Sequence, residues 1–470
     1  MSQFDKREWP MGFASSLVPR LGLAASGVSV LNAKWEPSTM PLRAVQRAAR
    51  CRFGVHSGKR CAQSARQVIY ARDLSSCAGT GSSAPSRALL TEKTWLPTLS
   101  GMALSELERL VTALGEKPYR ARQLYRWLYR LPLATQVDQM SDIGKRLREA
   151  LAQNTRLHAL RLGEAREARD GTRKLVYRVE DGDGAVESVL IPAPGRNTLC
   201  ISSQLGCAMN CQFCFTGKMG LRRNLVAAEI LDQVSLTRNL YETPRDARSH
   251  ISNVVFMGMG EPFQNLDNVL KVVEILLDPK GMGFSHNKVT VSTSGLVPEI
   301  RRYLRESRAN LAVSLNATTN QVRNWIMPIN RKYPLEELVE TLREEYARDP
   351  RRGEKVFFEY VLLGDINDSL EDAKRLLKIT ARVPCKVNLI PFNSHAGSEF
   401  RPSPLEQMEA FRRYLHERGV LVTLRRSRGD DQMAACGQLG SPGFESMPPR
   451  MRVPEAFQHL VQRRSADTTA

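Results

Sequence analysis

Apolar side chains first recur with helical spacing near residue 104. From Leu104 to about residue 131 they return every three or four positions, which is the spacing of one face of a helix. Gly115 and Pro118 interrupt this pattern, because both residue types disfavour the interior of a helix. The segment therefore predicts two helices, and Ser105, with Glu108 three residues later, is a candidate N-cap for the first.

Further along the chain, apolar and polar residues alternate. Residues 172–192 do so on either side of an Asp-Gly-Asp-Gly turn at 181–184, which predicts two paired strands. A third strand begins at Arg196 and contains Cys200. Together these strands predict a short strand-rich segment after the helices.

Beyond Cys200, strands and helices follow one another to about residue 425. The candidate strands are 254–257, 289–292, 311–315, 356–362, 387–390 and 420–424, and helical stretches such as 225–240, 266–278 and 335–347 lie between most of them. This alternation predicts a parallel sheet with helical crossovers, either an open doubly wound sheet or a full or partial barrel. In both arrangements the chemistry lies at the carboxyl ends of the strands.

The second predicted helix interleaves arginines with aromatic residues, namely Arg120, Arg122, Arg126 and Arg130 with Tyr125, Trp127 and Tyr129. Guanidinium groups pair with phosphates and rings stack on unpaired bases, so this composition suits RNA. Helical spacing nevertheless directs some of the rings inward. For this helix alone, the pattern favours rings in the core and arginines on a solvated face.

Composition adds a partner class to this picture. The 470 residues are 42% hydrophobic and 25% charged, as in a globular protein of two or three domains, and no run approaches the roughly 20 apolar residues of a membrane span. A formal net charge of +19 favours a polyanion such as nucleic acid. Arginine-rich stretches at 120–130, 301–308 and 425–428 are expected to lie around one cleft.

Nearly half of the excess charge lies in the first 100 residues, which contain 14 basic and 5 acidic side chains. This leader is rich in Ser, Ala and Arg and lacks sustained apolar periodicity, as organellar transit peptides do. A disordered basic tail, or untranslated sequence upstream of a start at Met102, accounts for it equally well.

Cys207, Cys211 and Cys214 form a CxxxCxxC run in a loop directly after a strand. Three thiolates can hold three irons of a [4Fe-4S] cube and leave the fourth iron open to a small molecule. A zinc site usually takes a fourth protein ligand, and no His or Cys follows closely. The run favours a cluster over zinc or unligated thiols, and nine cysteines are too few for a disulfide scaffold.

With other short motifs, this run resembles the radical S-adenosylmethionine (SAM) enzymes. More narrowly, it is similar to the bacterial dual-specificity RNA methyltransferases that modify C2 of adenosine in 23S ribosomal RNA and in transfer RNA. The motifs are Val-Glu-Ser-Val at 186–189, Thr-Leu-Cys at 198–200, Phe-Met-Gly-Met-Gly-Glu-Pro at 256–262, Val-Ser-Thr-Ser-Gly at 291–295, Ser-Leu-Asn-Ala at 314–317, Ile-Pro-Phe-Asn at 390–393, and Arg-Gly-Asp-Asp to Ala-Cys-Gly-Gln-Leu at 428–439. The resemblance covers about residues 103–440.

The resemblance implies an α/β fold, a partial (β/α)6 radical SAM barrel with a small helical N-terminal domain and a strand-rich connector. The expected organisation is a leader over 1–100, a helical RNA-binding accessory domain over 101–160, the connector over 161–196, the catalytic domain over 197–440 and a C-terminal tail over 441–470.

The chemistry that the resemblance implies uses two cysteines outside the cluster. C2 of adenine is electron-poor and cannot attack a methylsulfonium, so one SAM methylates the sulfur of Cys436 and a second SAM is cleaved to a 5′-deoxyadenosyl radical. The radical formed on the S-methyl group then adds to C2. Glu187 matches the base that accepts the C2 proton, and Cys200 matches the cysteine that forms a transient disulfide with Cys436.

Taken from the residues alone, these three positions have simpler interpretations. Cys200, in a strand, is a small core residue, and Glu187, in an alternating strand, is a solvent-facing carboxylate. Cys436 lies in a loop with Gly and Asp, a poor place for a core thiol, so a reactive thiol and an inert one are about equally expected.

The resemblance also implies one [4Fe-4S] cluster on the three loop cysteines, two SAM molecules per turnover, and SAM contacts at strand ends. These contacts are Gly260, Glu261, Ser292, Ser314, Leu315, Asn316 and Asn393. Asn316 stands where many members have His, and Phe392 where others often have Trp. Turn chemistry alone also favours Ser, Asn and Gly at such positions.

Two other functions remain open on the sequence. The sister activity at adenine C8 shares the cluster and both cysteines, and a non-catalytic iron-sulfur RNA-binding protein would need only the cluster and the basic charge. The expected partners are 23S rRNA, tRNA and an electron donor such as flavodoxin, with no membrane and a monomeric chain. The expected location is the cytoplasm, or a plastid or mitochondrion if the leader is a transit peptide.

Overall fold

The computed structural model describes residues 96–460, apart from 181, 183, 244–245, 350–354, 396 and 441–449. The three interpretations of the leader, and much of the predicted C-terminal tail, lie outside these residues. Among the helices that are described, none combines the length and the apolar composition that crossing a bilayer would require.

Three short helices come first in the described chain: α1 (Leu104–Ala113), α2 (Arg120–Tyr129) and α3 (Lys145–Asn154). The first two match the predicted pair. The predicted cap at Ser105 is wrong, because α1 already begins at Leu104, after Ala103. The Ala103 N–H donates to the Glu106 carboxylate at 2.8 Å, so Glu106 satisfies the donor that the cap was expected to serve.

The aromatic side chains of α2 are mainly core residues, as its periodicity favoured. Tyr125 and Tyr129 are buried and lie edge to face, whereas Arg122 and Arg130 are exposed. The Tyr125 hydroxyl donates to the Asp278 carboxylate at 3.0 Å, across 153 positions of sequence. Tyrosines therefore fix this helix against the rest of the described chain.

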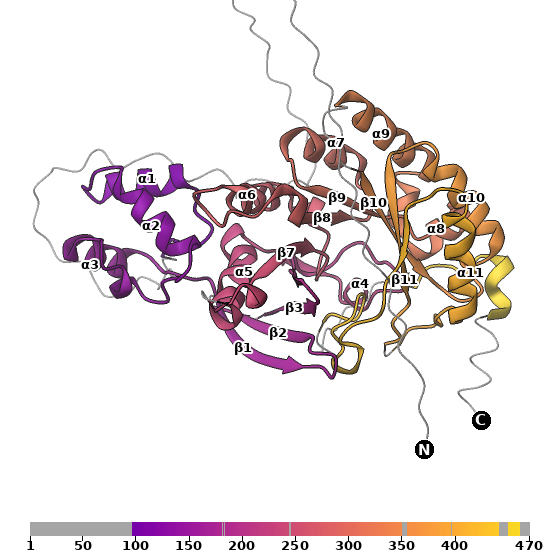
Figure 1. The fold of residues 1–470 in the computed structure, drawn as a ribbon, viewed down its shortest axis with the longest axis horizontal. Coiled ribbons are helices and arrows are strands. Elements are labelled where there is room, and N and C mark those ends of the chain that lie inside the picture. Colours follow the sequence, from indigo (N-terminus) through magenta and orange to yellow (C-terminus); the bar gives the residue numbers. More distant parts are fainter. Residues whose placement is uncertain are drawn as a thin grey trace, which may run out of the picture. The chain divides into compact units, whose positions relative to one another are not determined.

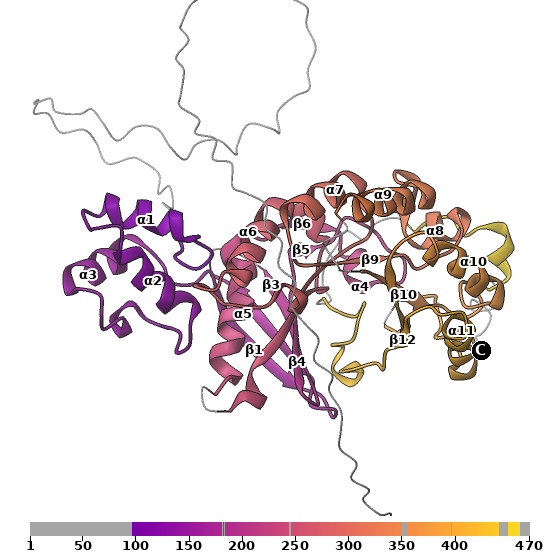
Figure 2. The same ribbon diagram turned by 45° about the horizontal axis from the view of Figure 1, so that its top comes forward.

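One continuous sheet organises the remaining residues (Figures 1 and 2). Its order is β1-β2-β3-β4-β7-β8-β9-β10-β11-β12. The first four strands are antiparallel: β1 (Leu160–Glu167), β2 (Arg173–Val179), β3 (Ala185–Ala193) and β4 (Arg196–Cys200). The strands from β4 onward are parallel: β7 (Ile251–Phe256), β8 (Val289–Thr293), β9 (Asn310–Ser314), β10 (Val356–Leu362), β11 (Cys385–Pro391) and the short β12 (Val422–Leu424).

Crossover helices connect the parallel strands and lie along the outside of the curved sheet in Figure 2. They are α5 (Ala227–Tyr241), α6 (Leu266–Leu277), α7 (Val297–Glu306), α8 (Asn320–Ile326), α9 (Leu335–Arg348), α10 (Leu370–Thr380) and α11 (Leu405–His416). A small hairpin, β5 (Gln204–Gly206) and β6 (Leu221–Asn224), flanks the one-turn helix α4 (Phe215–Lys218). The predicted α/β fold with a partial barrel is confirmed.

Candidate active site

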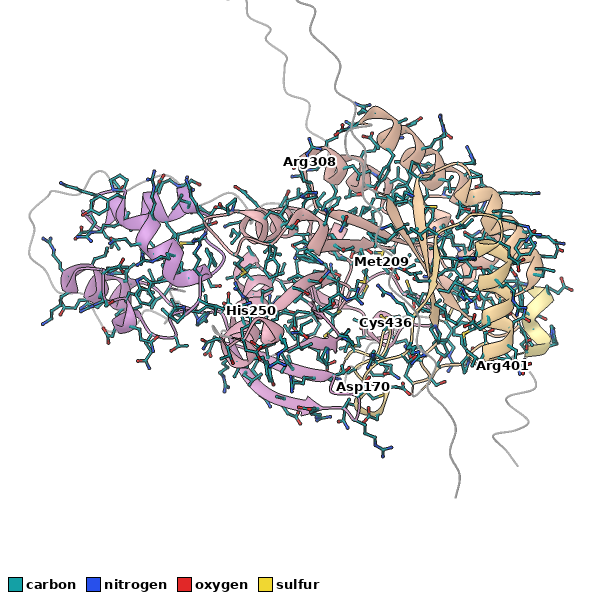
Figure 3. All side chains as sticks on the ribbon, viewed as in Figure 1. Asp170, Met209, His250, Arg308, Arg401 and Cys436 are labelled. Atoms are coloured by element: carbon teal, nitrogen blue, oxygen red, sulfur yellow. The ribbon has the colours of Figure 1, made fainter. Side chains whose placement is uncertain are left out.

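A cavity opens at the carboxyl ends of the parallel strands, where the alternating pattern places the chemistry. Nearly all of the predicted site residues line it, namely Cys207, Cys211, Cys214, Gly260, Glu261, Ser292, Ser314, Asn316, Asn393 and Cys436. Three predicted site residues, Glu187, Cys200 and Leu315, do not. Figure 3 shows Cys436 near this centre, between Met209 of the cysteine-rich loop and Asp170 of the β1–β2 connection.

The three loop cysteines follow β5 and are positioned by backbone contacts. The Cys207 N–H donates to the Gly220 carbonyl at 2.8 Å and the Cys214 N–H to the Cys211 carbonyl at 3.1 Å. Between them, the Gln212 N–H donates to the Ile326 carbonyl at the end of α8, at 3.0 Å. The loop is thus held from two sides, with all three thiols toward one cavity.

This donor set fits a cluster better than a single ion. Nowhere in the described part of the chain do three or more His, Cys, Asp or Glu side chains converge to hold one metal ion. In a [4Fe-4S] cube each thiolate binds a different iron, so convergence on one point is not required. Burial raises the pKa of all three thiols, which leaves them protonated until iron displaces the protons.

Gly260 and Glu261 form the wall next to the cysteines. Gly260 has φ of 101°, and a Cβ there would lie 2.5 Å from Gln204 Cβ, so only glycine fits this approach. The buried Glu261 carboxylate accepts the Phe263 N–H at 3.0 Å and the Ser294 N–H at 2.8 Å. Burial raises the pKa of Glu261 against the opposing effect of these donors. Glu261 therefore joins the ends of β7 and β8.

The ends of β9 and β10 are joined in a similar way. Asn316 has φ of 54°, its side-chain oxygen accepts the Val361 N–H at 2.8 Å, and its carbonyl accepts from the Asn367 amide at 2.7 Å. Leu315 is fully buried, and its N–H donates to the Glu359 carbonyl at 3.0 Å. The predicted position Leu315 thus lies behind the cavity wall, whereas Ser292 and Ser314 lie on it.

Arg323, which the sequence analysis did not select, supports these strand ends from behind. It is fully buried on α8 and donates to the carbonyls of Ser294, Ser314 and Leu315 and to the Asn330 side chain, at 2.8 to 3.0 Å. Burial lowers its pKa to about 10, so the guanidinium stays charged at neutral pH. The sequence around Arg323 gives no signal that distinguishes a buried, supporting arginine from an exposed one.

Replacing Arg323 by methionine is expected to lower the free energy of unfolding by about 3 kcal/mol or more, because four buried acceptors lose their donor. Urea unfolding of the full chain measures this change. Arg343, which is half exposed and paired with Glu340, provides the matched control, and Arg343→Met should unfold like the wild type. Equal stability of the two variants would contradict the supporting role of Arg323.

Cys436 lies on the segment 429–440, the Cys436 loop, which follows β12. Its carbonyl accepts from the Asn393 amide at 3.1 Å, and the Asn393 side-chain oxygen in turn accepts from the Ser427 hydroxyl at 2.5 Å. The Cys436 side chain is accessible to solvent within the cavity, while the surrounding protein raises the pKa of its thiol. Asn393, predicted as a SAM contact, therefore also fixes this cysteine.

Cys200 ends β4 and is buried in a small apolar cluster with Val189, Ala434 and Leu439. Burial raises the pKa of the Cys200 thiol, and the nearby Cys436 raises it further. Arg425 forms an ion pair with Glu359 at 3.5 Å, and this carboxylate is the main reason that the pKa of Arg425 is raised. Arg425 also interacts electrostatically with both cysteines. The two predicted cysteines are thus close enough to interact electrostatically with each other and with Arg425, and both are free thiols.

Glu187 is not the solvent-facing carboxylate that its alternating strand indicated. Its side chain is about 4% exposed and forms an ion pair with Lys174 at 2.9 Å. Its Oε2 also accepts the Gly440 N–H at 2.8 Å. The alternation was misleading because the Cys436 loop covers this face of β3, a contact across 253 positions of sequence.

The arginine-rich stretches that are predicted to surround one cleft do not gather at this cavity. Arg425 lines the cavity, whereas Arg301, Arg305 and Arg308 form ion pairs with carboxylates on or just after α9.

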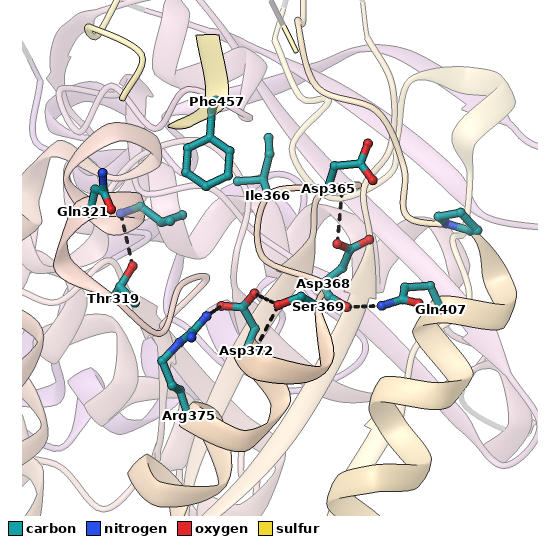
Figure 4. A pocket seen from close by; sticks show the side chains of 12 residues that line it. Thr319, Gln321, Asp365, Ile366, Asp368, Ser369, Asp372, Arg375, Gln407 and Phe457 are labelled. Carbon is teal, nitrogen blue, oxygen red and sulfur yellow. Dashed lines mark hydrogen bonds and ion pairs between the residues drawn. The ribbon is translucent and has the colours of Figure 1, made fainter. Parts of the chain in front are cut away.

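A second cavity, at the N-terminus of α10, is acidic (Figure 4). There Ser369 caps the helix through Asp372, and Arg375 pairs with Asp372 at 2.6 Å, so these groups satisfy one another.

Comparison with known proteins agrees with this geometry. The family model of the ribosomal RNA large subunit methyltransferase N-terminal domain matches residues 98–157, and the radical SAM superfamily model matches residues 201–377. A dual-specificity RNA methyltransferase RlmN of Geobacter sulfurreducens is 49% identical over 342 residues, which cover 73% of this chain and 91% of that protein. One of Anaeromyxobacter is 46% identical over 368 residues, covering 77% and 96%.

A solved structure supports the same assignment. The crystal structure of a radical SAM methyltransferase from Sphaerobacter thermophilus is similar with a TM-score of 0.68 and 42% identity, covering 73% of this chain and 98% of that one. The radical SAM fold implies a [4Fe-4S] cluster and SAM as cofactors. The chain belongs to the RlmN family of dual-specificity RNA methyltransferases within the radical SAM superfamily.

Proposed function

We propose that this protein methylates C2 of adenine in 23S rRNA and in tRNA through a methylated cysteine. One observation carries the assignment of roles: the Cys436 side chain opens into the same cavity as Cys207, Cys211 and Cys214. A cysteine that only packed in the core would not be exposed there. Membership of the RlmN family supports RNA as the substrate, and the proposed location of the reaction is the cytoplasm.

The three loop thiolates hold the cluster, and the strand-end residues hold SAM beside it. When bound, the cluster and SAM supply a 5′-deoxyadenosyl radical after one-electron reduction by an external donor such as flavodoxin. Two SAM molecules would be used in each turnover, one as methyl donor and one as radical source. The protein contributes a cavity in which Gly260 allows close backbone approach and Glu261, Asn316 and Arg323 hold the strand ends rigid.

Cys436 Sγ carries the methyl group that reaches C2 of the adenine. After the new carbon–carbon bond forms, the sulfur of Cys436 joins protein and RNA covalently. The adduct loses the C2 proton to the base and one electron to the oxidised form of the external donor system. The Cys200 thiolate then attacks the sulfur of Cys436, the bond from sulfur to the methylene carbon breaks, and its electron pair stays with that carbon, which takes up a proton and becomes the methyl group. A Cys200–Cys436 disulfide remains for external thiols to reduce. Their shared neighbour Arg425 stabilises whichever of the two is the thiolate.

Glu187 is the proposed acceptor of the C2 proton. In the described arrangement its carboxylate is bound to Lys174 and to the Gly440 N–H, and it lies outside the cavity lining. It therefore acts in this role only when residue 440 moves away with the Cys436 loop.

The helices over 101–160 are proposed as an RNA-binding accessory domain, with exposed Arg122 and Arg130 toward the backbone phosphates of RNA. The functional unit is a monomer.

The decisive experiment is mass spectrometry of nucleosides from cells that lack the gene. Loss of 2-methyladenosine from both 23S rRNA and tRNA is expected, with recovery when the wild-type chain is supplied. Loss of 8-methyladenosine instead would assign the sister reaction at C8. Unchanged levels of both nucleosides would contradict an RNA methyltransferase function in that cell.

A further inference from the structure

A buried ion pair on the β2–β3 hairpin contacts the Cys436 loop at two points. Lys174 and Glu187 are 2.9 Å apart, with side chains about 5% and 4% exposed. Lys174 Nζ also donates to the Met433 carbonyl at 3.2 Å, and Glu187 Oε2 accepts the Gly440 N–H at 2.8 Å. The pair thus binds the backbone on both sides of Cys436, three residues before it and four after it.

The strand register explains why these two side chains meet. Val176 lies opposite Glu187, and Lys174 lies opposite Val189. Residues two positions apart point to the same face of a strand, so Lys174 and Glu187 are diagonal neighbours on one face of the antiparallel pair. This face is the one that the Cys436 loop covers.

The same face also carries Cys200. Val189 lies opposite Cys200 in the β3–β4 register, and both pack with Ala434 and Leu439 of the loop. Apolar contacts therefore seat the loop over Cys200, and the ion pair fixes its backbone beside them.

Further contacts limit where the loop can lie. The Gly429 N–H, at its start, donates to the Asp170 carboxylate at 3.2 Å. At its end Gly440 has φ of 139°, and a Cβ there would lie 2.4 Å from Met219 Sδ, so a glycine is required. Between these ends, the Cys436, Gly437 and Leu439 carbonyls accept from Asn393, from the Phe215 N–H and from the Thr216 hydroxyl. Lys174 supplies the charged donor to this backbone, at Met433.

We propose that Lys174 is a positioning residue for the methyl-carrying cysteine, acting through Glu187 and the Met433 carbonyl to hold Cys436 over Cys200. This inference rests on the proposed roles of the two cysteines. Lys174 is not among the residues that line the cavity. It holds the Glu187 carboxylate in place against the loop backbone while the loop is seated.

The test measures positioning without RNA. The full chain with its cluster is treated with glutathione disulfide, and the Cys200–Cys436 disulfide is quantified over time by mass spectrometry of unreduced peptides. One thiolate attacks glutathione disulfide and releases a first glutathione, leaving a mixed disulfide on the protein. The second thiolate attacks that mixed disulfide and releases a second glutathione, so the two glutathiones together carry away the two electrons. Lys174→Met should form this disulfide on the order of 10- to 100-fold more slowly, because a displacement of about 1 Å has effects of this size.

Three further variants separate positioning from stability. Lys174→Arg keeps the charge and the donors and should stay within about threefold of the wild type. Arg238→Met removes one partner of a similarly buried ion pair on α5. Arg238 contacts Glu242, the Tyr129 carbonyl and the Phe284 ring, so this variant should form the Cys200–Cys436 disulfide at the wild-type rate. In Lys174→Met/Glu187→Gln both charges are gone, and the reaction should remain slow because Met433 still lacks its donor.

Recovery of the wild-type rate in the double variant would overturn the proposal, since the defect would then come from an unpaired buried carboxylate. A wild-type rate in Lys174→Met would overturn it as well. Absence of 2-methyladenosine formation by the wild-type protein would instead refute the proposed function, so the two failures are distinguishable.

Discussion

The Cys436→Ala variant is expected to form no measurable 2-methyladenosine, a loss of roughly 10⁴-fold or more, which is the scale on which removal of a covalent nucleophile acts. The reason is chemical: without this sulfur no methyl group can be carried to the electron-poor C2. The measurement is 2-methyladenosine formed per enzyme in a reaction with unmodified 23S rRNA fragments or tRNA.

The Cys200→Ala variant should fail at a later step and accumulate a protein–RNA adduct. Its Cys436 still accepts the methyl group and still joins C2, but no thiolate is present to release the RNA. Denaturing gels should show RNA that migrates with protein and is absent from Cys436→Ala. The two cysteines act at successive steps of one covalent reaction, so one variant should form no adduct and the other should accumulate it.

Cys385 provides the matched control for both variants. It is a partly buried thiol on β11 that contacts the Thr380 carbonyl and does not line the cavity. Cys385→Ala should form 2-methyladenosine at the wild-type rate and no adduct. Full activity of Cys436→Ala would instead favour an iron-sulfur RNA-binding protein, and an absence of adduct with Cys200→Ala would contradict the assigned order of steps.

Replacing Cys211 by serine is expected to have the second large effect, because a cube held by three thiolates loses one of its iron ligands. Iron and sulfide per protein chain should fall to near zero, together with the visible absorbance of the cluster, and 2-methyladenosine formation should fall to background. Chemical analysis of iron and sulfide measures the first effect independently of activity. Cys385→Ser, prepared in the same way, should keep its cluster.

The same variant should remain folded. Cys211 contributes its carbonyl to the Cys214 N–H, a contact that serine retains, and Gln212 still donates to Ile326. Melting temperature separates the two cases. A Cys211→Ser protein that retained a full complement of iron would show that the cysteine run is not the ligand set.

Much of the catalytic domain could be predicted from its hydrophobic pattern. Strand 356–362 appears in the structure with the same bounds, because a buried central strand is apolar on both faces and its limits are sharp. Strand β1 was not predicted, since only Leu160 among its residues is buried and it shows no alternation. The hairpin β5–β6 was too short to give a periodic signal.

Site residues could be predicted where they share one short sequence motif. They could not be predicted where their position depends on contacts with a segment distant in the sequence. Cys207, Cys211 and Cys214 share one loop, so their spacing is visible in the sequence. The burial of Glu187 depends on Gly440, and the position of Arg323 depends on strand ends that only the fold assembles. No local pattern contains such information, because periodicity reports the face of an element and not what will cover that face.

The attachment of the Cys436 loop to the β2–β3 hairpin also sets an order of assembly during synthesis. The cluster loop ends at Cys214, while Cys436 follows about 220 residues later, which takes a ribosome roughly 10 to 45 s at about 5–20 residues per second. During this interval the Cys436 loop is not yet present to cover the face of β3 that carries Glu187. The loop thus completes the enclosure of Glu187 and Cys200 late in folding, and a chain truncated before residue 429 would lack the Ala434, Leu439 and Gly440 contacts that cover them.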